Sequence, residues 1–264
     1  MKLKKAAIGM AMAALFAAPA YADSFVNGGF ESGNTSGWTV GSSGDRSSIL
    51  NPAMSPATFL PGGTEYNTNA PHSAIIASGT VDPNIGAALG TTVYSGNSSY
   101  RVEDTTFGGY ASAISQTVSN YTEANIFFAW KAVLENGGHD QDESALMMLT
   151  LHDDTTNTTV ISRIYNAGAG GGGVDTRFST LGDFFYTADW QIEQLAIDSA
   201  LSGHTFTLSV LAADCNPTGH TGYVYLDGFG SVTPPTSDVP EPTSLALMGI
   251  GLAGLMASRR RKQV

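Results

Sequence analysis

The chain has 264 residues, a formal net charge of −11 at pH 7 and a single cysteine. Seven of its twelve basic residues lie in the first five and last six positions, so residues 23–233 carry five basic against twenty-one acidic side chains. Such a surface repels phosphate backbones and anionic lipid, which argues against nucleic-acid and membrane-surface binding, and one thiol cannot form an internal disulfide.

Residues 1–22 have the pattern of a secretory signal peptide. Three lysines precede an apolar run over residues 6–18, and Ala20 and Ala22 are the small residues that a signal peptidase reads. We therefore expect an N-terminal signal helix that signal peptidase removes after Ala22. The remainder of the chain should then be exported across the inner membrane.

The body, residues 23–233, has the pattern of strands throughout. Short runs rich in β-branched and aromatic residues alternate with clusters of Gly, Asn, Asp, Ser and Thr, and no amphipathic helix of ordinary length follows the signal peptide. The predicted strands cover residues 73–78, 113–118, 126–134, 145–152, 159–165, 190–197, 205–212 and 222–229. Many short strands separated by turns predict an all-β fold, a jelly-roll β-sandwich.

Two stretches of the body should connect strands. Residues 51–69 contain three prolines and are expected to form a long surface loop, and residues 154–158 should form a hairpin loop. The run 168–173 formally contains G-x-G-x-x-G, but no helical pattern follows it, so we expect a loop and no dinucleotide site.

The two ends of the body carry related motifs. Near the start, an Asn-Gly-Gly turn interrupts the strand-like residues of the segment 25–30, and Glu31 follows at once. Near the end, the alternating run 222–229 carries one acid, Asp227. An acidic side chain beside glycine carbonyls supplies the oxygen ligands that Ca²⁺ takes.

Together, Asn27-Gly28-Gly29-Phe30-Glu31 and Tyr225-Leu226-Asp227-Gly228 resemble the opening and closing strands of galactose-binding-like jelly rolls, especially the β-sandwich carbohydrate-binding modules. The resemblance implies a structural calcium between the two strands, held by the Gly29 carbonyl, Glu31 and Asp227. No acid in Ala70-Pro71-His72-Ser73 matches the further ligands of that family. The alternative is that Glu31 and Asp227 serve as turn residues or hydrogen-bond partners without a metal.

The densest polar patch, residues 136–143, contains His139 and three acids, and His152 with two more acids follows the next strand. Such ligands could hold Ca²⁺, Mn²⁺ or Zn²⁺, but the spacing fits no ligand motif, and solvated hairpin loops at the two ends of one strand explain it more simply. Cys215 is expected to be a buried structural residue, with metal binding or intermolecular pairing as alternatives. No nucleophile elbow is present and no carboxylate pair stands out, so we predict no catalytic residue and no enzyme.

Sugar binding requires exposed aromatic rings and hydrogen-bonding side chains. The three tryptophans, Trp38, Trp130 and Trp190, lie in strand-like apolar runs and are expected in the core. Four tyrosines in polar, loop-like surroundings are the better candidates for glycan contacts: Tyr66, Tyr94, Tyr100 and Tyr110.

The C-terminal part begins with a linker, residues 234–238. Then follow the triplet Pro240-Glu241-Pro242, sixteen uncharged residues from 243 to 258, and a basic block, 259–262. The prolines hold the triplet extended, where a protease can grip it. As a helix the uncharged run spans roughly 24 Å, which is short of the roughly 20 residues of a comfortable transmembrane helix. The basic block should stay in the cytoplasm.

This order of parts, over residues 239–264, resembles the PEP-CTERM sorting signal. The resemblance implies recognition by an exosortase, a transient inner-membrane anchor with its transmembrane helix at 243–258, and removal of the tail. It further implies a final place at the cell surface or in the extracellular matrix, together with exopolysaccharide.

Three functions are compatible with these observations. We expect a non-catalytic, exosortase-processed surface or matrix protein that is retained in exopolysaccharide and promotes biofilm or floc formation. The first alternative is a lectin-like carbohydrate-binding module with a defined glycan ligand, and the second is an extracellular polysaccharide hydrolase. Saturable glycan binding distinguishes the first alternative, and activity that is lost with one carboxylate distinguishes the second.

Overall fold

The computed structural model of the chain describes residues 25–67, 72–168, 173–217 and 219–232. The predicted signal peptide 1–22, linker 234–238 and sorting segment 239–264, with its helix at 243–258, lie outside the described residues. The centre of the glycine-rich run 168–173 lies outside them as well. Within the four described ranges, no helix is both long enough and apolar enough to cross a membrane.

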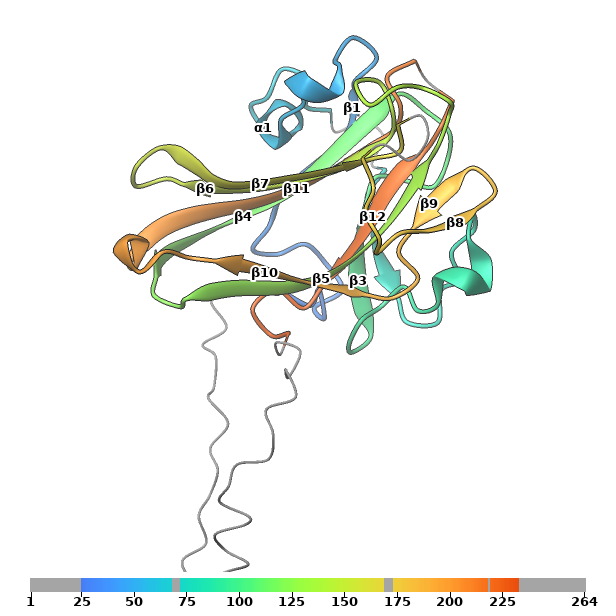
Figure 1. Cartoon of the computed structure of the whole chain (residues 1–264). Coiled ribbons are helices and arrows are strands. Elements are labelled where there is room, and N and C mark those ends of the chain that lie inside the picture. Colours follow the sequence, from blue (N-terminus) through green and yellow to red (C-terminus); the bar gives the residue numbers. More distant parts are fainter. Residues whose placement is uncertain (1–24, 68–71, 169–172, 218, 233–264) are drawn as a thin grey trace, which may run out of the picture.

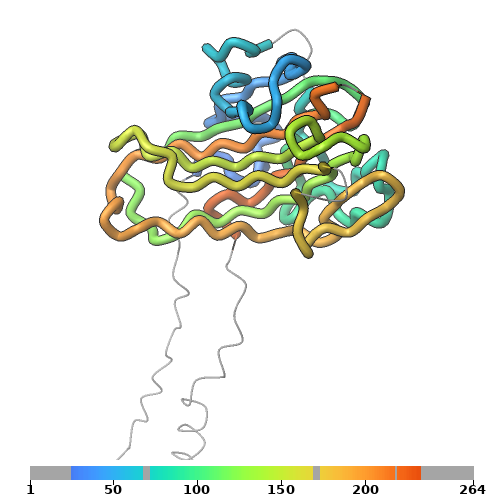
Figure 2. The backbone as a smooth tube through the Cα atoms, turned by 45° about the horizontal axis from the view of Figure 1, so that its top comes forward, coloured from blue at the N-terminus to red at the C-terminus, as the bar shows by residue number. Residues whose placement is uncertain are grey.

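Two antiparallel sheets pack face to face as a β-sandwich, which confirms the predicted all-β fold (Figures 1 and 2). The first sheet consists, in spatial order, of β1 (Thr39–Asp45), β4 (Tyr110–Tyr121), β11 (His204–Ala213), β6 (Leu146–Asp153) and β7 (Thr158–Asn166). The second consists of β2 (Ala74–Ala77), β3 (Ser98–Val102), β12 (Gly222–Asp227), β5 (Asn125–Glu135), β9 (Phe184–Tyr186) and β8 (Ser179–Leu181), and β10 (Gln191–Ala196) also pairs with β5.

The helices of the described residues are short: α1 (Pro56–Phe59), and the 3₁₀ turns η1 (Asn51–Ala53), η2 (Gly86–Leu89) and η3 (Ser199–Leu201). The stretch 51–67, predicted as a surface loop, contains η1 and α1 and lies over the first sheet (Figure 1). Its Phe59 is fully buried there against β4 and β11. Gly41 of β1 makes this possible, because a Cβ at that position would lie 1.8 Å from the Phe59 carbonyl oxygen.

The strand β12 shows how the alternation of side chains builds two layers of core. Val224 and Leu226 face the space between the sheets and join the main core cluster. Tyr223 and Tyr225 point to the other face, where both hydroxyl groups donate hydrogen bonds to the buried carboxylate of Asp82 at 2.8–3.0 Å. Every residue of this central strand is therefore buried.

An aromatic cluster joins the first and last described segments at one edge of the sandwich. The ring of Phe229 stacks on Phe128 with centroids 4.6 Å apart, and Trp38 and Phe30 pack against it from the N-terminal segment. Trp130 is fully buried, while Trp38 and Trp190 are half-buried and pack against core clusters. The predicted packing role of the three tryptophans is confirmed.

Most of the predicted strands are present, with one correction. All eight predicted runs contain observed strands, whereas β1, β3, β8 and β9 were not predicted. The segment 25–30, read as part of an opening strand, consists of turns instead. Asn27 and Phe30 have φ of +52° and +57°, because the chain bends twice there to place the Phe30 ring inside the core.

Candidate functional site

The three predicted calcium ligands come together around the loop 94–98 that leads into β3. Glu31, on the turn after Phe30, accepts hydrogen bonds from the backbone N–H groups of Asn97 and Ser98 at 2.9–3.0 Å. Gly96 must be glycine here, because its φ is +72° and a Cβ would lie 2.5 Å from Glu31 Oε1. Sequence reasoning missed this loop, since its amides act through the backbone.

Asp227, at the end of β12, completes the cluster. Its Oδ2 accepts hydrogen bonds from the N–H groups of Tyr94 and Ser95 at 2.9 and 3.0 Å. Its Oδ1 is buried and has no hydrogen-bond partner among the described residues. Burial raises the pKa of Asp227 to about 6, and the charge of Glu31 adds to this effect while the backbone hydrogen bonds oppose it.

The donor chemistry of this cluster fits a hard cation. A Cβ at Gly29 would lie 3.5 Å from Asp227 Oδ1 and 3.7 Å from Glu31 Cγ, so the glycine lies directly beside both acids. A buried carboxylate oxygen without a partner gains one when it binds a cation, and the hydrogen-bonded oxygens of Glu31 keep further lone pairs. We call Gly29, Glu31 and Asp227 the carboxylate clamp.

The four candidate tyrosines are placed differently. Tyr66, Tyr94 and Tyr110 have exposed fractions of 37, 39 and 40 %. Tyr100, in contrast, is only 2 % exposed and its ring stacks on Phe30 with centroids 5.2 Å apart. It lies on β3, which was not predicted, so the interpretation of Tyr100 as a loop residue able to contact glycan was wrong.

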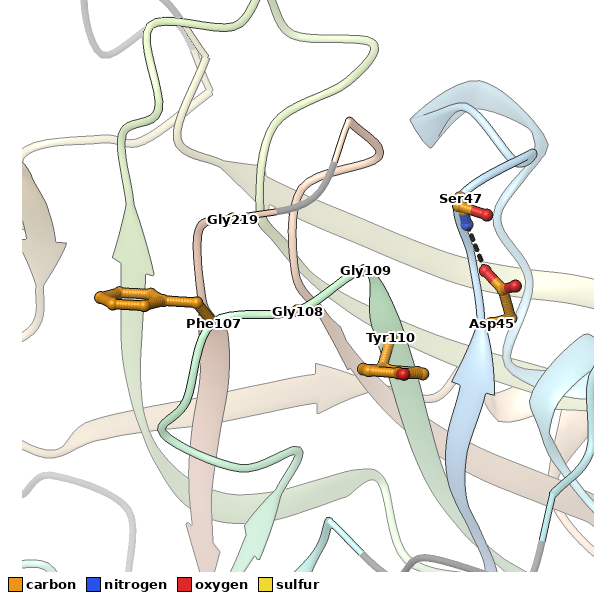
Figure 3. A pocket seen from close by; sticks show the side chains of 7 residues that line it. All are labelled: Asp45, Ser47, Phe107, Gly108, Gly109, Tyr110 and Gly219. Carbon is orange, nitrogen blue, oxygen red and sulfur yellow. Dashed lines mark hydrogen bonds between the residues drawn. The ribbon is translucent and has the colours of Figure 1, made fainter.

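An open depression of about 470 Å³ lies at one end of the sandwich around Tyr110 (Figure 3). Its lining residues come from the end of β1 and the turn after it, from the start of β4 and the segment before it, and from the β11–β12 connection: Asp45, Ser47, Phe107, Gly108, Gly109, Tyr110 and Gly219. Phe107 is 65 % exposed, and Figure 3 shows it at the opposite side from Asp45, with Tyr110 between them. Two aromatic rings and a carboxylate therefore share one surface of ligand-binding size.

The polar side of the depression is fixed by local hydrogen bonds. Asp45 Oδ1 accepts a hydrogen bond from the Ser47 N–H at 2.8 Å. This backbone hydrogen bond and that of the Ser47 side chain lower the pKa of Asp45, so the carboxylate is ionised at neutral pH and can accept hydrogen bonds from hydroxyl groups.

The Tyr110 ring is held from behind by a buried network. It packs edge-on against the ring of His72, with centroids 4.9 Å apart. His72 Nδ1 lies 2.5 Å from Glu103 Oε1, and the other oxygen of this buried acid accepts a hydrogen bond from Ser112. The hydrogen bond with Glu103 raises the pKa of His72. The ring of Tyr110 is thus pre-oriented although one side of it is exposed.

A second depression, of about 290 Å³, lies on the outer face of the first sheet. It is lined by Thr150, His152, Thr207 and Ser209 on the strands, by Pro56 of α1 and by Leu60, which follows α1. Its lining contains no Phe, Tyr or Trp. For stacking on a sugar ring, the depression at Tyr110 is therefore the better candidate.

The fold places the described part of the chain among the antiparallel two-sheet β-sandwiches. Residues 238–262 match the PEP-CTERM protein-sorting motif. This match confirms that the C-terminal part, with its triplet Pro240-Glu241-Pro242, carries the PEP-CTERM sorting motif, and it indicates an exported protein that is sorted by exosortase. A comparison with curated proteins finds no match.

Several solved structures are similar to the described sandwich. The carbohydrate-binding module TmCBM61 in complex with β-1,4-galactotriose is 13 % identical, with 78 % of this chain and 94 % of that chain covered and a TM-score of 0.40. CBM28, a carbohydrate-binding module specific for non-crystalline cellulose, is 13 % identical, with 77 % of this chain and 92 % of that chain covered and a TM-score of 0.36. A cyclase from Fischerella sp. TAU is 12 % identical, with 77 % of this chain and 92 % of that chain covered and a TM-score of 0.37. Likeness at this level concerns overall shape and transfers no ligand or activity.

Proposed function

We propose that the protein is exported, anchored transiently in the inner membrane, cleaved by exosortase and retained in exopolysaccharide at the cell surface or in the extracellular matrix. There it binds polysaccharide saturably and without catalysis, as in the lectin-like alternative, and promotes biofilm or floc formation. The observation that carries the binding part of the proposal is the depression where Phe107, Tyr110 and Asp45 share one exposed surface. The sorting motif over residues 238–262 supports the route.

The charge of the protein narrows the class of glycan. Residues 23–233 contain twenty-one acidic and five basic side chains, and an ionised Asp45 lines the depression. An acidic polysaccharide would be repelled by this surface. We therefore expect a neutral polysaccharide, whose apolar ring faces pack on Phe107 and Tyr110 while its hydroxyl groups donate to Asp45.

Calcium has a structural role in this proposal. The carboxylate clamp would hold a Ca²⁺ ion through Glu31, Asp227 and the Gly29 carbonyl, and so join the N-terminal segment to the last strand. The buried Oδ1 of Asp227, which has no partner among the described residues, supports this assignment. Tyr94 lies on the loop that binds the clamp and packs edge-on against Trp190, so we assign it to this structure and not to the glycan site.

Complementation of a deletion strain tests the function in cells. Loss of the gene should reduce floc formation and polysaccharide retention, and the wild-type gene should restore both. The double variant Phe107→Ala/Tyr110→Ala should be exported but found in the medium, because its sorting tail is intact and its glycan surface is lost. Tyr66→Ala, which removes a tyrosine of nearly equal exposure elsewhere, is the matched control. Full restoration by the double variant would contradict the proposed site.

A further inference from the structure

A histidine–cysteine cluster lies at the end of the sandwich where two connections cross between the sheets. His139 lies between β5 of the second sheet and β6 of the first, and Cys215 and His220 lie between β11 of the first sheet and β12 of the second. Because Leu134 pairs with Gly222 and Leu146 pairs with Ala213, the two connections start and end side by side (Figure 1).

The three side chains have the spacing of metal ligands. His220 Nδ1 lies 3.2 Å from Cys215 Sγ and 3.2 Å from His139 Nε2, and all three atoms lie within 4.8 Å of one another. A tetrahedral Zn²⁺ ion, with Zn–N of about 2.0–2.1 Å and Zn–S of about 2.3 Å, places such ligand atoms about 3.3–3.6 Å apart. The two contacts of 3.2 Å need to lengthen by only a few tenths of an ångström to fit this geometry, and the third pair of atoms lies within 4.8 Å.

Hydrogen bonding alone cannot satisfy every polar atom of this cluster, because one ring nitrogen has two partners. A single imidazole nitrogen has either one lone pair or one proton in the ring plane, so it makes one well-directed hydrogen bond. His220 Nδ1 has two partners at the same distance, Cys215 Sγ and His139 Nε2. A metal ion bound to all three atoms satisfies each of them at once.

The backbone around the cluster is held in place. The N–H of Cys215 donates to the carbonyl of His220 at 3.1 Å, and the N–H of Asn216 donates to the carbonyl of Glu143 at 2.7 Å, which ties the two connections together. A Cβ at position 137 would lie 2.2 Å from His220 Nδ1, so only glycine leaves room for the imidazole ring. The ligands therefore belong to a packed arrangement in which Cys215 is fully buried.

We propose that His139 Nε2, His220 Nδ1 and Cys215 Sγ bind one Zn²⁺ ion, with the fourth position left to water or to an external donor. Two imidazoles and a thiolate form a borderline-soft donor set that selects Zn²⁺ over Ca²⁺ and Mg²⁺. Binding transfers the thiol proton to solvent and links the two connections between the sheets. None of its three ligands belongs to the carboxylate clamp, and none lines the depression at Tyr110.

The test uses the purified full-length protein, stripped of metal and kept in excess Ca²⁺ so that the carboxylate clamp is not the variable. Titration with Zn²⁺ against a chromophoric chelator should give one tight site per chain. Co²⁺ in place of Zn²⁺ should produce the intense visible bands of a tetrahedral site and a near-ultraviolet thiolate-to-cobalt charge-transfer band. Absence of that charge-transfer band would overturn the proposal.

Variants identify the ligands. Cys215→Ser and His139→Gln should each weaken Zn²⁺ binding at least about tenfold, and His139→Gln, in a half-buried loop position, should leave the circular dichroism spectrum unchanged. His152→Gln removes a half-exposed histidine from the end of β6 and should bind Zn²⁺ like the wild type. Wild-type affinity in both ligand variants, or an equal loss in His152→Gln, would overturn the proposal.

Discussion

The variant Asp227→Asn is expected to melt at a higher temperature than the wild type in EDTA at pH 7.5, and at a lower temperature than the wild type in excess calcium. The reason is the buried Oδ1 of Asp227, which has no partner among the described residues. Without a cation, an ionised carboxylate at this place costs stability, and the neutral amide removes that cost while keeping an oxygen for the N–H groups of Tyr94 and Ser95.

The same carboxylate makes stability depend on pH with a defined sign. Because the pKa of Asp227 is raised to about 6 in the folded state, the folded protein binds this proton more tightly than the unfolded chain does. The contribution of this carboxyl group to the free energy of unfolding is therefore largest below its unfolded pKa of about 4, and it is lost as the pH rises through 6. In EDTA, the wild type should lose roughly 4–8 °C in Tm from this group between pH 4 and pH 7.5, and Asp227→Asn should not.

Calcium should reverse this dependence, since it binds the ionised form. At a hundredfold excess over its Kd, a ligand of the folded state adds about 2.7 kcal/mol of stability, or roughly 5–10 °C in Tm for a domain of this size. Differential scanning calorimetry of the wild type and of Asp227→Asn, at pH 4 and pH 7.5 and with EDTA or Ca²⁺, measures these changes in Tm. Asp198→Asn, which removes an exposed carboxylate from another turn, is the control. An unchanged calcium response in Asp227→Asn would falsify the clamp as a calcium site.

Phe30→Ala should destabilise the protein by about 3–5 kcal/mol, the usual cost of removing a buried aromatic ring. Phe30 is fully buried, and its ring stacks on Trp38 and Tyr100 and meets Phe229 edge-on. The loss should also weaken calcium binding, because Glu31 is the next residue and depends on the same turn.

Urea unfolding in EDTA measures this effect without the contribution of calcium. Phe107→Ala removes an exposed phenylalanine and should change the free energy of unfolding by less than about 0.5 kcal/mol. Phe30→Gly should be no less stable than Phe30→Ala, because the φ of +57° at this position suits glycine. A loss below about 1 kcal/mol in Phe30→Ala would show that the N-terminal segment is not packed as described.

The strands that sequence predicted are those rich in large apolar residues, such as β5, β6 and β11. β1 escaped prediction because its residues, Thr-Val-Gly-Ser-Ser-Gly-Asp, include two glycines and two serines. One of these glycines, Gly41, is needed for the close approach of Phe59, a long-range contact that no local pattern reveals. The prediction of a strand for the segment 25–30 was wrong for a related reason, since the turns of this segment are set by the packing of Phe30 in the core.

In the candidate sites, too, residues with a local sequence pattern were predicted, and residues brought together by long-range contacts were not. Glu31 and Asp227 were found by resemblance, whereas the loop that binds them acts through backbone N–H groups, which leave no residue signature. His139 was paired in sequence with His152, but the structure brings it to His220. That encounter depends on which strands pair between the sheets, and therefore on the complete topology.

The depression at Phe107, Tyr110 and Asp45 should bind a neutral polysaccharide. Isothermal titration calorimetry of the purified protein with exopolysaccharide from its own cells measures this binding. We expect saturable binding by the wild type and by Tyr66→Ala, and binding at least about tenfold weaker, about 1.4 kcal/mol, in the double variant Phe107→Ala/Tyr110→Ala. No saturable binding by the wild type, or equal affinity in the double variant, would contradict the claim.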